Sequence, residues 1–471
     1  MRRPYLVVVS ATAVAATALV ALYLAMMATA TPASAANLCT FGYGSIQAAI
    51  DAAGDGDTVR IAYGTYHENL VITEDITLQG GWSSKCTTRL YEDPQHTIID
   101  GGAAGSVVSV TTGSTATLDT LTLTNGHAQK GGGLYVSGAS PTLDNVVVTG
   151  NVISPTGSTQ SDYTQWAYGG GVFVENGTIT LTDCKITYNT SDPSAANICF
   201  GGGLALDWVP TGGATAVLEG TYIMSNSNPS DSTLYGGGLF LDAGSEVTFE
   251  GNDNLIAYNE AKAGGGVYMY GDVDLEGVLI LENYASMDGG GIFIASGWSG
   301  GRIANNYLAD NNSNQKGASV IVSDVDVEIA NNTIVGDLTG TGAGIDVIDT
   351  ANGVAELANN IVVSHTIGIR RNGSASATLD SNNVWGNTTN YVGLSAGSGD
   401  VSVDPEFVDP NNGDYHLAAG SPCVNAGTYV QGLPFDYDGD RRTGTLLDIG
   451  ADEYGSEYLV FVPGVLKRYA P

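Results

Sequence analysis

The sequence predicts an all-β solenoid, a single elongated body built from short strands that stack rung upon rung. Two sequence phrases support this prediction, and they alternate along most of the chain. The first, Leu-x-x-apolar-x-apolar-x-x-Asn, returns at intervals of 22 to 38 residues. The second is Gly-Gly-Gly followed by apolar-x-apolar, and its copies lie between copies of the first. The Gly-Gly-Gly phrases start at Gly131, Gly169, Gly201, Gly236, Gly264 and Gly289.

Within the phrases, residues alternate as expected for a β-strand with one buried and one exposed face. In the segment 178–182, apolar Ile179 and Leu181 alternate with threonines. Glycine and asparagine separate the strand segments, and no helical pattern lies between them, so a repeat that contains a helix does not fit the sequence. About eleven rungs fit between Thr58 and Asn387. The clearest copies of the nine-residue phrase are 143–151, 181–189, 218–226, 275–283, 303–311 and 379–387.

Residues 1–36 are typical of an export signal. Arg2 and Arg3 precede an apolar run, which is followed by small residues suited to cleavage after Ala35 or Ala36. The apolar run is also long enough for an uncleaved membrane anchor, which stays an alternative. With cleavage, we expect an extracellular or cell-surface monomer without a membrane span.

The N-terminal cap is expected over residues 37–57, before the solenoid at 58–395. It contains a short helix that starts at an N-cap Ser45 and ends at Gly54, and this helix can cover the open end of the solenoid. Export permits disulfides, and Cys39 with Cys86 is the favoured pair. Of the other cysteines, Cys184 is expected to be a buried thiol, and Cys199 and Cys423 stay unassigned.

The later copies of the nine-residue phrase carry asparagine at the fourth position, where earlier copies carry aliphatic residues. We expect these side chains to stack into a ladder of hydrogen-bonded amides at a corner of the solenoid. The alternative is that they are surface asparagines in ordinary turns. The residues concerned are Asn306, Asn332, Asn360 and Asn382.

Three segments near the N-terminus resemble a known class. Residues 46–50, 56–59 and 64–68 are similar to the opening of right-handed parallel β-helix proteins of the pectin-lyase-like superfamily. The Gly-Gly-Gly phrases also resemble repeats of polymorphic outer-membrane proteins. The resemblance covers residues 45 to about 390 and implies a right-handed parallel β-helix, but such a fold carries many activities.

Three segments near the C-terminus, 404–409, 420–427 and 448–454, resemble the choice-of-anchor Q region that closes many exported bacterial β-helix proteins. The resemblance implies a C-terminal cap over residues 396–455 and a location at the cell surface or outside the cell. Residues 456–471 form a tail that is too short to span a membrane.

The Gly-Gly-Gly phrases place an aromatic residue on the outer side of several successive strands. Unusually long segments, 152–168, 190–200 and 227–235, border these strands and carry further aromatics, Tyr163 among them. We therefore predict an aromatic groove that binds a glycan or a protein partner. Alternatively, the loops fold down and bury the stripe as a second core. The predicted binding residues are Tyr135, Phe173, Phe240, Tyr268 and Phe293 on the strands, with Trp166, Tyr168 and Tyr235 beside them.

Enzyme motifs are scarce. The resemblance to pectin methylesterases stops after residues 64–68, and the aspartate-pair motifs of polygalacturonases are absent. His127 and Lys130, with Glu175 and Asp207, form the one suggestive cluster, which can equally be a polar corner. We therefore expect a non-catalytic exported protein, with a polysaccharide lyase or glycoside hydrolase as the alternative.

The charge balance limits the partners. With 49 acidic residues against 16 Lys and Arg, the net charge is −33, so nucleic acid and anionic membranes are poor partners. Asp436, Asp438 and Asp440 alternate around a glycine, a spacing that can wrap Ca²⁺ in a turn. The alternative is an Asp-Gly turn that closes the C-terminal cap. No other cofactor is expected.

Overall fold

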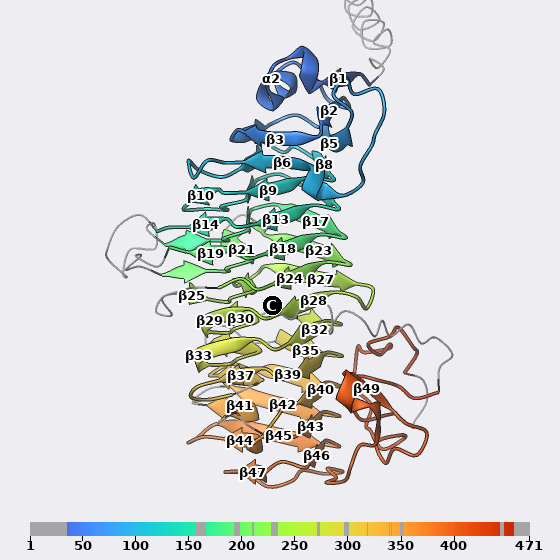
Figure 1. The fold of residues 1–471 in the computed structure, drawn as a ribbon. Coiled ribbons are helices and arrows are strands. Elements are labelled where there is room, and N and C mark those ends of the chain that lie inside the picture. The colour runs from blue at the N-terminus through green and yellow to red at the C-terminus, as the bar shows by residue number, and fades with distance from the viewer. Residues whose placement is uncertain are drawn as a thin grey trace, which may run out of the picture.

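The chain winds into a right-handed parallel β-helix in the computed structural model (Figure 1). The structure describes residues 35–155, 166–192, 198–209, 212–227, 234–270, 274–295, 301–317, 319–338, 340, 342–348, 353–442 and 447–455. Most of the expected export signal, the tail 456–471 and Tyr163 therefore lie outside the described residues. Among the described residues, none of the helices is long and apolar enough to cross a membrane.

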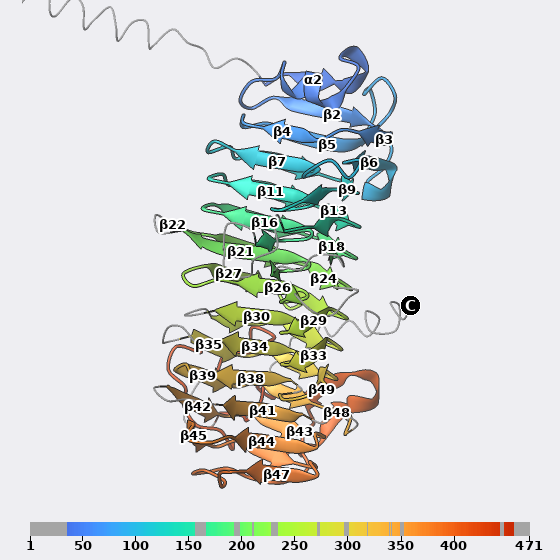
Figure 2. The same cartoon turned by 90° about the vertical axis from the view of Figure 1, so that its left-hand side faces the viewer.

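Two long sheets run the length of the rod, and the view in Figure 2 faces the 13-stranded one. The 12-stranded sheet contains β3 (Gly64–His67), β6 (Thr97–Asp100), β9 (Thr122–Thr124), β13 (Val147–Thr149), β18 (Lys185–Thr187), β24 (Tyr222–Met224), β28 (Leu255–Ala257), β32 (Leu279–Leu281), β36 (Tyr307–Ala309), β40 (Thr333–Val335), β43 (Ile361–Val363) and β46 (Asn383–Trp385). The 13-stranded sheet contains β4 (Leu70–Ile72), β7 (Val108–Thr111), β11 (Leu134–Ser137), β16 (Val172–Glu175), β21 (Leu204–Val209), β26 (Leu239–Leu241), β30 (Val267–Tyr270), β34 (Ile292–Ala295), β38 (Val320–Ser323), β41 (Ala343–Ile348), β44 (Ile367–Arg371) and β47 (Thr389–Val392), with β22 (Gly212–Gly213) paired to β21.

The third side of the rod is divided between an 8-stranded and a 5-stranded sheet. The first contains β1 (Asn37–Cys39), β2 (Thr58–Ala62), β5 (Thr77–Trp82), β8 (Thr117–Asp119), β12 (Thr142–Asp144), β17 (Thr178–Thr182), β23 (Thr215–Glu219) and β27 (Glu246–Glu250). The second contains β31 (Leu275–Glu276), β35 (Gly301–Ala304), β39 (Val327–Ala330), β42 (Val354–Ala358) and β45 (Ser376–Asp380).

Short strands continue the coils between the two long sheets, just before the Gly-Gly-Gly phrases. A 3-stranded sheet contains β10 (His127–Ala128), β14 (Val152–Ile153) and β19 (Thr190–Ser191). A 6-stranded sheet contains β15 (Ala167–Tyr168), β20 (Cys199–Phe200), β25 (Leu234–Tyr235), β29 (Glu260–Ala263), β33 (Tyr284–Asp288) and β37 (Asn312–Ser313). Twelve strands stack in the longest regular sheet, against the eleven or so rungs expected.

Like residues stack on like residues inside the rod, because the strands that form the coils pair in parallel with their equivalents in neighbouring coils. Leu118, Leu143, Leu181 and Leu218 pair in register, and all four are fully buried. These leucines open successive copies of the nine-residue phrase. The leucine that opens the phrase therefore marks the inward-facing position that each coil contributes to this column.

The Gly-Gly-Gly phrases let neighbouring coils approach closely. A Cβ atom on Gly202 would lie 2.5 Å from the carbonyl oxygen of Gly237 in the next coil, so no larger residue fits there without a shift. The first glycine of the phrase, Gly201, has a positive φ of 66°, a conformation that favours glycine.

The expected asparagine ladder is confirmed, and it ends on an aspartate. Each side-chain amide donates to the carboxamide oxygen of the next coil, and Asn382 donates to Asp400 Oδ1 at 3.0 Å. The preceding residue of each corner, for example Asn331 with φ 56°, is left-handed and turns the next side chain inward. The ladder runs through Asn306, Asn332, Asn360 and Asn382 at 2.9 to 3.0 Å.

A second asparagine ladder occupies the next corner, at the ninth position of the phrase. Its Nδ2-to-Oδ1 distances are all 3.0 Å, and its members are almost completely buried. Each amide also donates to a backbone carbonyl of the preceding coil, which satisfies polar groups that burial would otherwise leave unpaired. The members are Asn151, Asn189, Asn226, Asn259, Asn283 and Asn311.

The N-terminal end of the rod is covered by α2 (Ile46–Ile50) and a 3₁₀ turn, Thr40–Gly42. Ser45 Oγ accepts a hydrogen bond from the Ala48 amide, and the Glu68 carboxylate accepts from the first two helical amides at 2.9 Å. The Sγ atoms of Cys39 and Cys86 are bonded, which is the favoured pair. The other three cysteines are buried thiols.

Residues 401–442 and 447–455 lie along the side of the rod (Figure 1). The sequence resemblance implies a cap over the end of the rod, so the position of this segment differs from that expectation. This segment contains the hairpin strands β48 (Phe407–Asp409) and β49 (Asp414–Leu417), which a 3₁₀ turn, Pro410–Asn412, connects. A separate 3₁₀ turn, Pro94–His96, lies between β5 and β6. The C-terminal segment packs on the rod because of the apolar outer surface of the 12-stranded sheet. From β24 onward the strands of the 12-stranded sheet are apolar on their outer side as well, and this surface must be covered. Leu417, Cys423 and Ile449 cover Leu255, Leu281, Val335 and Val363.

Candidate functional site

The outward residues of the Gly-Gly-Gly phrases form one continuous column on the 13-stranded sheet. The parallel register places each of them beside its equivalent in the next coil. The stacking is close where both residues are aromatic, with ring centroids 5.1 Å apart for the Tyr268–Phe293 pair. The column runs Tyr135, Phe173, Ala205, Phe240, Tyr268 and Phe293.

The middle of this column is buried, so the prediction that Phe173 and Phe240 line an open groove is wrong. Phe173 is 0% and Phe240 3% exposed. Tyr168 and Phe200, which lie just before the Gly-Gly-Gly turns, fold over them with centroid distances of 5.2 and 4.4 Å. Ala205 leaves the space on its coil that the Phe200 ring fills. The alternative reading, a second core on the sheet, therefore holds for these residues.

The remaining aromatics are half-buried and border this second core. Tyr135, Trp166 and Tyr168 lie toward the N-terminal side. On the other side, Tyr235, Tyr268, Tyr270 and Phe293 form what we call the aromatic patch, in which Tyr270 is 40% exposed.

A column of carboxylates runs beside the aromatics on the same sheet. Glu175, the last residue of β16, pairs in register with Asp207 of β21, and Asp242 follows Leu241, the register partner of Leu206. Burial, together with the neighbouring Asp242 carboxyl, raises the pKa of Asp207 to about 7. One proton shared by two adjacent carboxyls is the expected state of such a pair near neutral pH.

Glu175 is ionised and held by two donors. Lys130 Nζ and the Tyr135 hydroxyl lie 2.7 and 2.6 Å from its two carboxylate oxygens. Burial alone would raise the pKa of Glu175, but these hydrogen bonds and the Lys130 charge lower it overall. The sequence cluster of Lys130, Glu175 and Asp207 is thus assembled, whereas His127 faces Asp192 at 4.0 Å.

Asp207 is expected to make the protein less stable as pH rises. Its folded pKa of about 7 exceeds the value of about 3.9 in an unfolded chain. Between these values the folded form holds a proton that the unfolded form has released, so the free energy of unfolding falls from about pH 4 to about pH 7. Asp207→Asn removes this contribution.

Urea unfolding on both sides of that pH window measures the effect. Asp207→Asn should flatten the decline, while Glu250→Gln, a change at an exposed carboxylate, should leave the wild-type profile. An identical decline in the Asp207→Asn protein would contradict the shared-proton pair.

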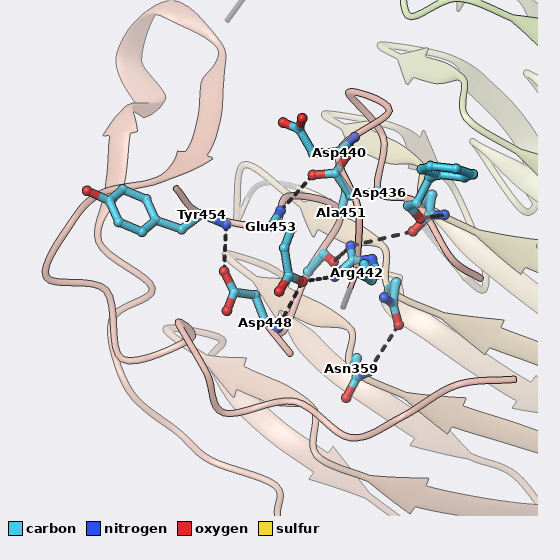
Figure 3. A network of polar contacts seen from close by, with 12 residues as sticks. Asn359, Asp436, Asp440, Arg442, Asp448, Ala451, Glu453 and Tyr454 are labelled. Atoms are coloured by element: carbon cyan, nitrogen blue, oxygen red, sulfur yellow. Dashed lines mark hydrogen bonds and ion pairs between the residues drawn. The ribbon is translucent and has the colours of Figure 1, made fainter. Parts of the chain in front are cut away.

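The Asp436, Asp438 and Asp440 side chains do not converge on one centre, and the Ca²⁺ prediction does not fit this geometry. Both Asp436 oxygens accept backbone amides, from Asp440 and Glu453, at 2.7 and 2.8 Å (Figure 3). Asp438 points instead to His416, with Oδ2 2.9 Å from Nε2. The Asp-Gly turn that was the alternative is what forms.

Asp436 belongs to a polar network that fastens the C-terminal segment to the rod (Figure 3). Arg442 donates to the Glu453 carboxylate at 2.9 Å and to the Gly450 carbonyl at 2.8 Å. The Gly450 amide in turn donates to the Asn359 carbonyl of the rod at 2.8 Å. The network therefore has a structural role, since it holds the C-terminal segment against the rod.

A cavity of about 560 Å³ opens where the C-terminal segment meets the 12-stranded sheet. Its size is within the range of small-molecule sites. The sequence repeat does not reveal this cavity, because the repeating coils supply only one of its walls and the C-terminal segment supplies the other. The polar residues used below are Tyr307, His416 and Asp438.

Three solved structures illustrate what this chain is similar to. Pectate lyase Pel9A aligns over 86% of this chain and 90% of its own, at 15% identity and a TM-score of 0.44. The surface protein and adhesin PfbA of Streptococcus pneumoniae aligns over 78% of this chain and 100% of its own, at 13% identity and a TM-score of 0.40. A double mutant of the periplasmic alginate epimerase AlgG aligns over 74% and 77%, at 11% identity and a TM-score of 0.34.

No curated protein sequence matches the chain. The family described as the right-handed β-helix region matches residues 95–283. Taken with the parallel register of the sheets, this match identifies the fold as a right-handed parallel β-helix.

Proposed function

We propose that this protein is exported to a bacterial cell surface or secreted, and that it binds a glycan through the 13-stranded sheet without cleaving it. The aromatic patch carries the proposal. Tyr268 and Phe293 are parallel within 2°, and Tyr270 adds a more exposed ring beside them. The exposed ring of Tyr270, with the half-buried rings beside it, offers apolar surface against which sugar rings pack.

The charge of the molecule narrows the glycan class. The chain carries a net charge of −33, and the Glu175–Asp207–Asp242 column lies on the same sheet as the aromatic patch. A polyanionic polysaccharide would be repelled by this surface. We therefore expect an uncharged glycan or one that bears amino groups.

Loss of two rings of the patch, one of them the exposed Tyr270, should weaken binding. Tyr270→Ala with Phe293→Ala is expected to weaken retention on the preferred glycan by at least about tenfold, because each ring stack contributes roughly 1 kcal/mol. Affinity electrophoresis against uncharged, amino and acidic polysaccharides measures this. The matched control is Tyr429→Ala, since Tyr429 is 73% exposed on the C-terminal segment.

Two results would contradict the proposal. One is no retention of the wild-type protein by any glycan, and the other is equal retention of the wild-type and double-variant proteins.

A second candidate function, glycoside hydrolysis, is favoured by one observation. Burial and the neighbouring Asp242 carboxyl raise the pKa of Asp207 to about 7, so Asp207 holds a proton below that pH. Glycoside hydrolysis uses such a carboxyl, whose pKa is raised, as its general acid. Release of reducing ends from the same polysaccharides, lost in Asp207→Asn, would support this function over binding alone.

A further inference from the structure

Three ionisable side chains that are distant in sequence meet at the base of the cavity beside the 12-stranded sheet. His416 lies on β49, Asp438 in the Asp-Gly turn and Asp452 near the end of the described chain. One ligand atom from each lies within 4.8 Å of the others. His416 and Asp452 are buried, as is most of the Asp438 side chain.

We propose that His416, Asp438 and Asp452 bind a divalent transition-metal ion. His416 Nε2 and Asp438 Oδ2 lie 2.9 Å apart. Two ligand atoms that share an ion with bonds of 2.0 to 2.2 Å are roughly 3 Å apart, so only a small adjustment is needed. The proposal is independent of glycan binding, which uses a different sheet.

The neighbouring groups orient these ligands as outer partners do in metal sites. His416 Nδ1 lies 2.6 Å from Asp414 Oδ1, so the ring is held with Nε2 facing the other two carboxylates. Asp452 Oδ2 accepts the Leu417 amide at 2.7 Å, and Asp438 Oδ1 accepts the Asn252 side-chain amide at 3.1 Å. Each carboxylate is fixed through one oxygen.

Tyr307 gives an independent indication of a ligand at this place. Its side chain is 5% exposed, and its hydroxyl has no hydrogen-bond partner among the described residues. The ring lies 5.8 Å from the His416 ring and lines the cavity. The Asp452 and Asp438 charges are its principal electrostatic neighbours. Such a buried hydroxyl is costly unless a ligand or a water in the cavity completes it.

The donor set selects the class of ion. A histidine nitrogen with two carboxylates suits Zn²⁺ or a neighbouring first-row divalent ion, whereas Ca²⁺ prefers six to eight oxygens. His416 and Asp438 also line the cavity. The remaining coordination positions of the ion would therefore face a space that holds a small ligand.

Calorimetric titration of the chelator-treated, tag-free chain with Zn²⁺ tests the site. We expect one tight site in the wild-type protein and a loss of affinity of more than about 100-fold in Asp452→Asn. Co²⁺ should give the visible absorption of a nitrogen- and oxygen-bound ion. Asp414→Asn, which leaves all three ligands, should weaken Zn²⁺ binding by about 10- to 100-fold, and it serves if Asp452→Asn fails to fold.

The matched control is Asp440→Asn, which changes the same turn outside the three-residue group and should bind Zn²⁺ like the wild-type protein. Weakened binding in that control would move the site to the turn and overturn the proposal. So would the absence of any tight Zn²⁺ or Co²⁺ site, a preference for Ca²⁺, or equal affinity in wild-type, Asp452→Asn and Asp414→Asn proteins.

Discussion

Phe173→Ala is expected to lower the free energy of unfolding by about 4 kcal/mol, the usual cost of removing a fully buried phenylalanine. Phe173 is completely buried, with Tyr135 and Tyr168 stacked on it at 6.0 and 5.2 Å. The substitution leaves a cavity. The half-buried rings around it cannot move in to fill it completely, because the sheet holds their backbones in register. Urea unfolding measures the change.

Phe293→Ala is the control for that variant, since Phe293 occupies the same column but is half-exposed. Its loss should be clearly smaller, because less apolar surface returns to water. Equal losses in the two variants would contradict the existence of a buried aromatic core on this sheet.

Asn226→Ala is expected to cost roughly 3 kcal/mol through the second ladder. The Asn226 oxygen accepts both the backbone and the side-chain amide of Asn189, each at 3.0 Å, and its own amide donates to Ile186 and Asn259. Alanine leaves the Asn189 backbone amide buried without a partner. Because each coil contacts only its neighbours, the damage should stay local.

Hydrogen exchange distinguishes this effect from general loosening of the rod. Amides near Asn189 and Asn226 should lose protection while those near Asn360 keep it. The exposed Asn411 supplies the matched change, and Asn411→Ala should leave both the unfolding midpoint and the exchange pattern unchanged. Similar destabilisation by both variants would argue against the ladder as a stabilising device.

The sequence predicts the rod itself well because the repeat is local and regular. Leu143 and Leu181 occupy equivalent places in consecutive coils, and the parallel register turns this periodicity into an inward column. The ladder at Asn306 follows from the same logic. The ladder at Asn226 also has a regular sequence signal, because an asparagine recurs at the ninth position of the phrase. The sequence shows that this residue repeats, and the structure shows that the side chains stack.

The features that escape the sequence depend on contacts between non-equivalent parts of the chain. Phe200 covers the aromatic column although it precedes the Gly-Gly-Gly turn, and only the small Ala205 hints at the space it fills. The spacing of Asp436 and Asp438 in the sequence does not reveal the hydrogen-bond partners of their carboxylate oxygens. These partners are backbone amides for Asp436 and the His416 ring for Asp438. The meeting of His416 with distant Asp452 requires the side packing of the whole segment.

That side packing does have a sequence signal. The outer positions of the 12-stranded sheet change from Lys185 and Thr187 in β18 to Leu255 and Ala257 in β28. A strand that is apolar on both faces must be covered on both. The signal indicates that something covers these coils, but it does not identify the segment.

One paired measurement tests the central claim, that the 13-stranded sheet carries a buried aromatic core beside a glycan-binding patch. Folding stability and glycan retention are measured together for Phe173→Ala and for Tyr270→Ala with Phe293→Ala. We predict that the first variant loses the larger share of stability yet retains binding per folded molecule, whereas the second keeps more stability and loses binding. Loss of binding in folded Phe173→Ala protein, with retention in the double variant, would contradict the assignment.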